Sequence, residues 1–332
     1  MKFHHKQKKQ GLYNPMNEHD SCGVGFVANI HGEKSHKIVS QGLELLTNLT
    51  HRGATGYDPK LGDGAGILIQ IPDIFFRNEL ESKGQNLPPI GKYAVGMCFF
   101  PQGKKNQALC ENKIREIIED EKQSFLNWRD VPFNNKDIAK AAKDVQPIIK
   151  QVFIGRNESL TNQAAFERKL FVIRKRIEIE ISKLTIEDPA NFYISSMSSR
   201  TIVYKGMLLA HEVGDFFPDL VDETSTSAIA LVHQRFSTNT FPAWELAHPY
   251  RMIAHNGEIN TVRGNINWIK ARAGKMESML LGDDLKKLWP LIDETQSDSA
   301  SFDNCLELLV AGGYSLPHAM MMLVPEAWSD NP

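Results

Sequence analysis

The stretch that decides the fold is CGVGFVANIHG, residues 22–32, because a polar leader gives way there to an apolar alternation. The leader, residues 1–21, is lysine-rich and offers almost nothing to a core. Apolar side chains recur at every second position of the stretch that follows, which predicts a strand over residues 22–31. The side chains expected to face the core are Val24, Phe26, Ala28 and Ile30.

Cys22 stands at the border between the leader and this strand. If the leader is removed, Cys22 becomes the first residue and its thiol lies beside a free α-amino group. Such an amine titrates near ~7.7–8.0 and can act as a base toward the thiol. For a lone cysteine the alternative is a small buried residue at the start of a strand. The motifs further along the chain favour the nucleophile.

The composition indicates a globular chain with an ordinary charge balance. Its 332 residues, 42% hydrophobic and 23% charged, suffice for one large domain or two smaller ones. The net charge of −2 gives no electrostatic reason to expect nucleic acid or an anionic membrane as a partner. The leader lacks the apolar segment of a secretory signal, so a cytoplasmic location is expected.

The cysteines form no C-x-x-C pair, which argues against a zinc site or an iron–sulfur cluster in this chain. Two of them lie on apolar stripes and are expected in the core, and one on an amphipathic helix is expected to be inert. These are, in turn, Cys98, Cys305 and Cys110.

Hydrophobic periodicity predicts mixed runs of helices and strands. This order favours antiparallel sheets covered by helices over a doubly wound parallel sheet. No repeat or low-complexity linker marks a domain boundary. The expected helices cover residues 35–50, 73–82, 104–121, 161–185, 262–274 and 298–312, and the expected strands after the first cover residues 65–71, 93–100, 147–156, 191–197, 200–205 and 227–236.

Two glycine-rich segments resemble nucleotide motifs without meeting their requirements. Residues 23–28 fit G-x-G-x-x-A, but a dinucleotide fingerprint opens a helix, and here the strand alternation runs through the glycines. Residues 62–66, GDGAG, lack the lysine of a phosphate-binding loop. A turn with a glycine at positive φ is therefore expected there.

Three late segments carry polar groups that suit a reaction on an amino acid. Asn256-Gly257 predicts a type I′ hairpin turn, or two donors for an oxyanion. Arg235, at the end of a core strand, suits bidentate capture of a carboxylate, or is a solvated strand end. Asp298 is expected to be a helix N-cap, or to receive an ammonium group.

Taken together, these segments resemble the class II glutamine amidotransferases. A cysteine followed by Gly-x-Gly-Phe, an H-x-R-F-S-T loop, an H-N-G-E-I turn and an S-D-S segment occur in that order. Residues 51–56, 62–66, 233–244 and 255–261 are most similar to the glutaminase domains of glutamate synthase large subunits. The resemblance implies the N-terminal-nucleophile hydrolase fold, an α+β, αββα sandwich of two antiparallel sheets flanked by helices.

The resemblance also implies roles for single residues. Residues 1–21 would be a propeptide, and residues 22–332 an amidotransferase domain, truncated at its C-terminus. Cys22 would be the nucleophile and its own amine the base, and Asn239 would stand where sugar-transferring relatives have a histidine. The implied catalytic residues are Cys22, Asn256 and Gly257, and the implied substrate-binding residues are Arg235, Thr238, Asn239 and Asp298.

The implied reaction is attack of the thiolate on the side-chain amide of L-glutamine, release of ammonia and hydrolysis of a γ-glutamyl thioester. The ammonia would serve the reductive amination of 2-oxoglutarate in a synthase part beyond Pro332, which would carry FMN and an iron–sulfur cluster. No cofactor or metal is expected in residues 1–332. Further implied partners are a small subunit or ferredoxin, with a plastid location in a photosynthetic eukaryote.

Two alternatives remain open. One is an N-terminal-cysteine amidase that acts on acylated amino acids, against which Arg235 and Asp298 argue, since that pair suits a free α-amino acid. The other is a free-standing or inactive amidotransferase domain that serves only as an interaction partner.

Overall fold

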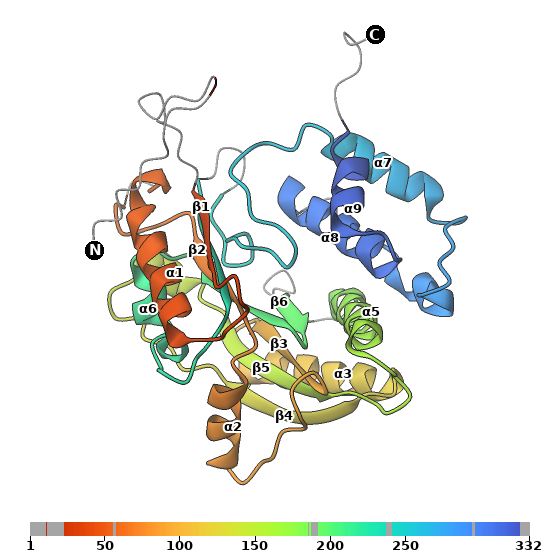
Figure 1. Cartoon of the computed structure of the whole chain (residues 1–332), viewed down its shortest axis with the longest axis horizontal. Helices are drawn as coiled ribbons and strands as arrows, with labels where there is room; N and C mark the ends of the chain where they lie inside the picture. Colours follow the sequence, from red (N-terminus) through yellow and green to blue (C-terminus); the bar gives the residue numbers. More distant parts are fainter. Residues whose placement is uncertain are drawn as a thin grey trace.

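Two four-stranded antiparallel sheets with helices on both sides make up the fold (Figure 1). The computed structural model describes residue 11 and residues 23–55, 58–184, 186, 192–236, 241–293 and 296–325. This architecture confirms the predicted αββα sandwich. The first sheet has the order β1-β8-β2-β7 and the second β4-β5-β3-β6. The strands are β1 Val24–Ala28, β2 Ala65–Gln70, β3 Tyr93–Phe100, β4 Ser124–Asp130, β5 Ile148–Gly155, β6 Tyr193–Ser198, β7 Thr201–Gly206 and β8 Ile229–Gln234.

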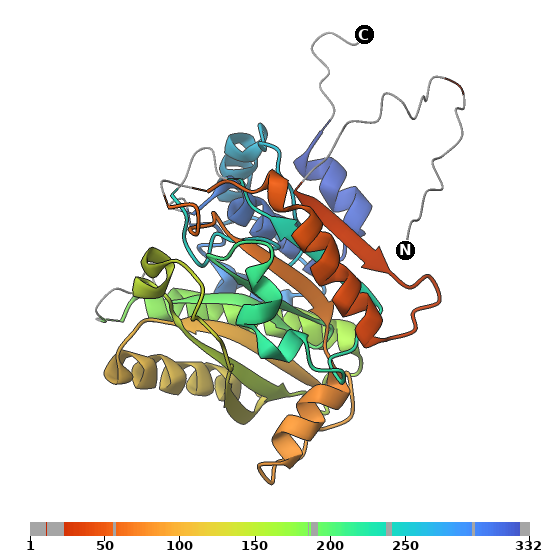
Figure 2. The same ribbon diagram turned by 90° about the vertical axis from the view of Figure 1, so that its left-hand side faces the viewer.

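The helices form layers on the two sheets and a further group near the C-terminal end (Figures 1 and 2). Helix α1 contacts the first sheet, and α3 and α5 contact the second. Within the described ranges, no helix has both the length and the apolar character needed to cross a membrane. The helices are α1 His36–Asn48, α2 Asp73–Glu81, α3 Lys104–Asp120, α4 Lys140–Asp144, α5 Gln163–Ser182, α6 Glu212–Phe216, α7 Val262–Arg272, α8 Asp298–Ala311 and α9 Leu316–Leu323.

Strand β3 is buried on both faces, which explains its uninterrupted apolar sequence. Val95 and Met97 belong to a core that includes residues of both sheets and of α1. Ala94 and Cys98 belong to a second core, beneath α3 and α5. One face of the second sheet packs on the first sheet and the other is covered by helices. A central strand such as β3 therefore has no face exposed to solvent for polar residues.

The prediction of which face of β1 is buried is wrong. Phe26 is 69% exposed and Ile30 90% exposed, whereas Val27 packs against the core. A Cβ on Gly25 would lie 2.7 Å from Leu45 Cδ2, so α1 covers the Gly25 side. The alternation predicted the period of the strand but not its covered face, because β1 is an edge strand and β7, not β1, adjoins the second sheet. The strand does run through the G-x-G-x-x-A segment, in agreement with the rejection of a dinucleotide site.

Strand β4 was not predicted, and its sequence explains why. It lies at an edge of the second sheet, and one of its core-facing residues is an arginine. The Arg129 guanidinium donates to the Asp219 carboxylate at 2.7 and 2.9 Å and to Glu79. A buried charge needs such a partner, and a pattern of apolar residues alone does not reveal it. Helices α4, α6 and α9 were also missed, all of them short.

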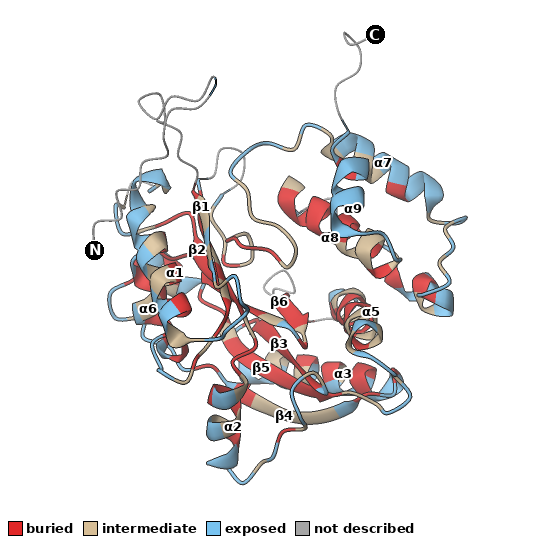
Figure 3. Ribbon diagram, viewed as in Figure 1, coloured by how far each residue is buried: buried red, intermediate tan, exposed pale blue. Residues whose placement is uncertain are grey.

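A third core joins the C-terminal helices to α5. Phe171 and Val172 of α5 pack with Leu306 and Leu308 of α8 and with Leu323 of α9. Figure 3 shows the buried residues of α8 and α5 in red and the exposed outer sides of α7 and α9 in blue. This packing fixes α8 relative to the sheets and therefore fixes where the N-terminal end of α8 lies.

The close approach of α1 to the first sheet should make Gly42 intolerant of a side chain. A Cβ there would lie 2.6 Å from Ala230 Cβ and 3.2 Å from Ile67 Cδ1. We expect Gly42→Ala to lower the free energy of unfolding by about 1–3 kcal/mol, measured by urea denaturation. Gly264→Ala is the matched control, since Gly264 is also helical but has open space around it; it should be neutral or stabilising by up to about 1 kcal/mol. Equal effects at both sites would contradict the packing argument.

Candidate functional site

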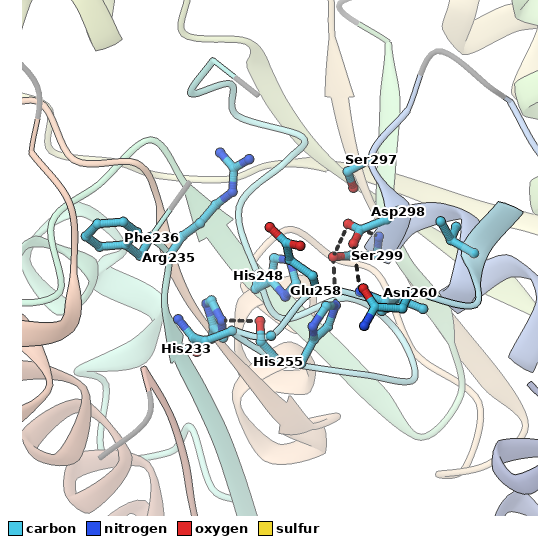
Figure 4. Close-up of a pocket in the computed structure, with 14 residues that line it drawn as sticks. His233, Arg235, Phe236, His248, His255, Glu258, Asn260, Ser297, Asp298 and Ser299 are labelled. Carbon is cyan, nitrogen blue, oxygen red and sulfur yellow. Dashed lines mark hydrogen bonds between the residues drawn. The ribbon is translucent and has the colours of Figure 1, made fainter. Parts of the chain in front are cut away.

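A cavity of about 330 Å³ lies between the end of β8 and the N-terminal end of α8 (Figure 4). Four residues that the sequence singled out line it: Arg235, Asn256, Gly257 and Asp298. They come from the end of β8, from the loop that precedes α7, and from the first turn of α8. Three further predicted site residues lie outside the described residues; these are Cys22, Thr238 and Asn239.

The start of β1 lies against the Asn256 side chain. The Gly23 carbonyl accepts a hydrogen bond from the Gln234 amide at 2.6 Å, which continues the β1–β8 ladder beyond Val24. A Cβ on Gly23 would lie 2.6 Å from Asn256 Nδ2 and 2.3 Å from the Gln234 carbonyl oxygen. Only glycine permits this approach, so the first glycine of the opening stretch serves close packing.

The hairpin turn predicted at Asn256-Gly257 is not present. No strand flanks these residues, and neither of them has a positive φ, which a type I′ turn requires at both central positions. Side-chain contacts on either side hold the segment as an open loop instead. Asn256 Nδ2 donates to the Gln234 carbonyl at 3.3 Å, and the Ile259 amide donates to Asp298 Oδ2 at 3.3 Å.

Arg235 is buried, so the alternative of a solvated strand end is wrong. Only 7% of it is exposed, and burial lowers the pKa of its guanidinium. Its Nη1 donates to the Asp63 carbonyl at 3.3 Å, and its backbone amide donates to the Gly64 carbonyl at 2.8 Å. Gly64 has φ +131°, as predicted for the GDGAG turn. That turn therefore helps to hold the arginine at the cavity.

The sequence predicted that Asp298 is the N-cap of α8, and this prediction is wrong. Ser297 is the cap, and its Oγ accepts from the Ala300 amide at 3.2 Å. Asp298 is the first helical residue, and its Oδ1 accepts from the Ser299 amide at 2.6 Å. Its carboxylate lines the cavity, on the wall opposite the end of β8 (Figure 4).

Three histidines to which the sequence analysis assigned no role also line the cavity: His233, His248 and His255. His233 Nε2 lies 2.9 Å from the His255 carbonyl oxygen. A carbonyl only accepts, so His233 carries a proton on Nε2. Burial lowers the pKa of His233 to about 4, so the ring is neutral near pH 7. The period of the strand could have indicated His233 as a lining residue, because it stands two residues before Arg235 and therefore on the same face.

The described cysteines are unsuited to nucleophilic chemistry. All three are buried, as predicted for Cys98 and Cys305, and burial raises the pKa of Cys110 to about 11 and that of Cys305 to about 12. Burial also raises the pKa of Cys98. Among the residues that the structure describes, no cluster of three or more His, Cys, Asp or Glu side chains could hold a metal ion.

Comparison with known proteins adds to this geometry. Residues 22–332 match the family described as glutamine amidotransferases class-II. The chain is 48% identical over 331 residues to the glutamate synthase [NADPH] large chain of Bacillus subtilis, an alignment that covers 100% of this chain and 21% of that protein. It is 46% identical to the glutamate synthase [NADH] of Saccharomyces cerevisiae, with 96% and 15% covered. It is 40% identical to the chloroplastic ferredoxin-dependent glutamate synthase of Oryza sativa, with 98% and 20% covered. The chain thus spans about a fifth or less of these relatives.

The buried neutral state of His233 should make stability depend on pH. Its folded pKa of about 4 lies below the usual 6.5, so the unfolded chain takes up a proton first as the pH falls. This contribution is complete above pH 6.5 and is lost toward pH 4, by up to about 3 kcal/mol. We expect His233→Gln, which keeps a donor near the Nε2 position, to lose less stability than the wild type between pH 7 and pH 4.5. The exposed His31→Gln is the control, and identical pH profiles for all three proteins would contradict the burial argument.

Proposed function

The chain belongs to the class-II glutamine amidotransferases, and on that premise we propose that it releases ammonia from L-glutamine with Cys22 as the nucleophile. The observation that carries the proposal is the close approach of Gly23 to Asn256. A Cβ added to Gly23 would lie only 2.6 Å from Asn256 Nδ2. Cys22 is one peptide bond before Gly23, so their Cα atoms are about 3.8 Å apart. This supports a thiol within reach of the Asn256 amide.

In the proposed reaction, removal of residues 1–21 frees the α-amine of Cys22, which accepts the thiol proton. The thiolate attacks the side-chain amide carbon of glutamine, and the carbonyl oxygen becomes an oxyanion. Asn256 Nδ2 and the Gly257 amide donate to that oxyanion. The protonated amine returns its proton to the departing ammonia, which leaves a γ-glutamyl thioester. Water hydrolyses the thioester through a second oxyanion and restores the thiol.

A guanidinium and a carboxylate on different walls of the cavity, Arg235 and Asp298, support a free amino acid as the substrate. We assign the α-carboxylate of glutamine to Arg235, at the end of β8, and its α-ammonium to Asp298, at the start of α8. Figure 4 draws the two side chains on different walls of the cavity. Thr238 and Asn239 follow Arg235 in the sequence and are proposed as further contacts. No observation favours the amidase that acts on acylated amino acids, because acylation would remove the ammonium group.

The relatives suggest where the ammonia goes. All those named above are glutamate synthases, of which the chain spans 15–21%. We propose that residues 22–332 form the glutaminase domain of such an enzyme, after a propeptide of residues 1–21, and that its ammonia is used for reductive amination of 2-oxoglutarate. FMN, an iron–sulfur cluster and a contact with ferredoxin or a small subunit would belong to the synthase part. A cytoplasmic or plastid location would suit this assimilation of ammonia.

The first test combines intact mass with activity. We expect the purified 37.4-kDa chain to lose residues 1–21 and to hydrolyse glutamine, and Cys22→Ala to abolish hydrolysis while it keeps the fold. Cys110→Ala is the matched control, because it removes a thiol that is buried in the core beneath α3 and α5, and it should retain activity. Hydrolysis by the Cys22→Ala variant at the wild-type rate would refute the proposal. A full-length mass together with no turnover would favour the inactive, interaction-only alternative.

The second test concerns the α-ammonium. Loss of a charged hydrogen bond costs about 1.5–3 kcal/mol, so Asp298→Asn should lower kcat/KM for glutamine by roughly 10- to 100-fold. For glutaramate, which is glutamine without its α-amino group, kcat/KM should fall much less, since only the hydrogen bond from the Ile259 amide to Asp298 Oδ2 is then affected. Asp144→Asn, which removes an exposed ion pair with Lys140, serves as the control. A loss on glutaramate as large as that on glutamine would show that Asp298 does not receive the ammonium.

A further inference from the structure

His255 is engaged at both of its polar ends, although it was not among the residues assigned to the reaction. Its backbone carbonyl accepts from His233 Nε2 at 2.9 Å, and its ring Nε2 lies 2.8 Å from Ser299 Oγ (Figure 4). It directly precedes Asn256, the proposed oxyanion donor. The ring and the carbonyl therefore tie this position to α8 and to β8 at once.

The direction of each hydrogen bond follows from the donors available. The hydroxyl of Ser299 has one proton, and the carboxylate of Asp298, 3.2 Å away at Oδ1, is a stronger acceptor for it than the nitrogen of a neutral imidazole. Ser299 Oγ must then accept from the ring of His255, so His255 carries its proton on Nε2. His255 thus connects His233, through its backbone carbonyl, to Ser299, through its ring, and Ser299 in turn bonds to Asp298.

The loop that follows His255 is held at its other end as well. The Ile259 amide donates to Asp298 Oδ2 at 3.3 Å, so residues 255–259 are attached at both ends to the first turn of α8. His233, in turn, pairs with Val24 in the β1–β8 ladder. The loop that carries Asn256 and Gly257 is therefore fixed between the sheet beside the nucleophile and the carboxylate of Asp298.

From this arrangement we infer that His255 is a positioning residue that sets the spacing between the oxyanion donors and the acceptor of the substrate ammonium. The inference rests on the proposed function, because that function gives the two ends their roles. Glutamine must reach both ends at once, and a misplacement of about 1 Å in such a site can cost about 100-fold in rate. His255 itself touches neither end of the substrate in this scheme.

The test is a double-mutant cycle in the matured full chain. His255→Phe removes the ring donor, and Ser299→Ala removes its acceptor; each should lower kcat/KM for glutamine by roughly 100-fold, with effects on kcat and KM alike. Because both variants break the same hydrogen bond, the double variant should fall little further than either single one. His255→Gln, with an amide donor near the Nε2 position, should recover most of the activity. His318→Phe, on the exposed side of α9, is the control and should match the wild type.

Full additivity of the two substitutions, or wild-type kcat/KM for His255→Phe, would overturn the inference. A readout that needs no turnover separates this failure from failure of the proposed function. Long-range ¹H–¹⁵N spectra of the folded chain should show His255 with its proton on Nε2, and Ser299→Ala should shift that signal. A wild-type chain that shows the Nε2 proton of His255 but does not hydrolyse glutamine would refute the proposed function. The hydrogen bond between His255 and Ser299 would still be supported. A chain in which His255 carries its proton on Nδ1 would refute the inference, whatever its activity.

Discussion

The antiparallel pairing of β1 with β8 is the interaction on which the rest of the site depends. Val24 pairs with His233, and the Gly23 carbonyl continues the ladder to Gln234. These are the first and last strands in the described part of the chain, and their pairing puts the residue after Cys22 beside the strand that Arg235 follows. Every other site contact is arranged around this edge: the GDGAG turn supports Arg235, and the loop at Asn256 packs on Gly23.

The electrostatics of the cavity follow from how deeply these groups are buried. Burial removes the charge of His233 near pH 7, so that it acts only as a hydrogen-bond donor to a backbone carbonyl. Arg235 is buried too, but a guanidinium stays protonated at any ordinary pH. The neutral histidine can therefore stand two residues from the arginine without a repulsive charge. The cavity is left with the cationic Arg235 near β8 and the anionic Asp298 near α8, and the carboxylate of Glu258 lies between them (Figure 4).

The sequence predicted a strand correctly where its hydrophobic pattern was strong. It failed where the position of the strand in the sheet determined which face is buried. The uniform apolar run of β3 predicted its bounds correctly, because both of its faces are covered. In β1 an alternation of apolar residues predicted the wrong face, since β1 is an edge strand of the first sheet and β7 adjoins the second sheet instead. Four of the residues that line the cavity were found through motifs, whereas the hydrogen bond between His255 and Ser299 was not. Their partners are distant in sequence, and no local pattern records them.

The two cores on either side of β3 have a consequence for how this domain can diverge. Each substitution in β3 must fit one of the two separately packed cores. Gly96 has no room even for a methyl group, since a Cβ would lie 2.7 Å from Val152 Cγ1. Strand β1 differs, because Phe26 already faces solvent. Among related domains, β3 should therefore accept few changes, while the outer face of β1 remains free to vary around its fixed glycines.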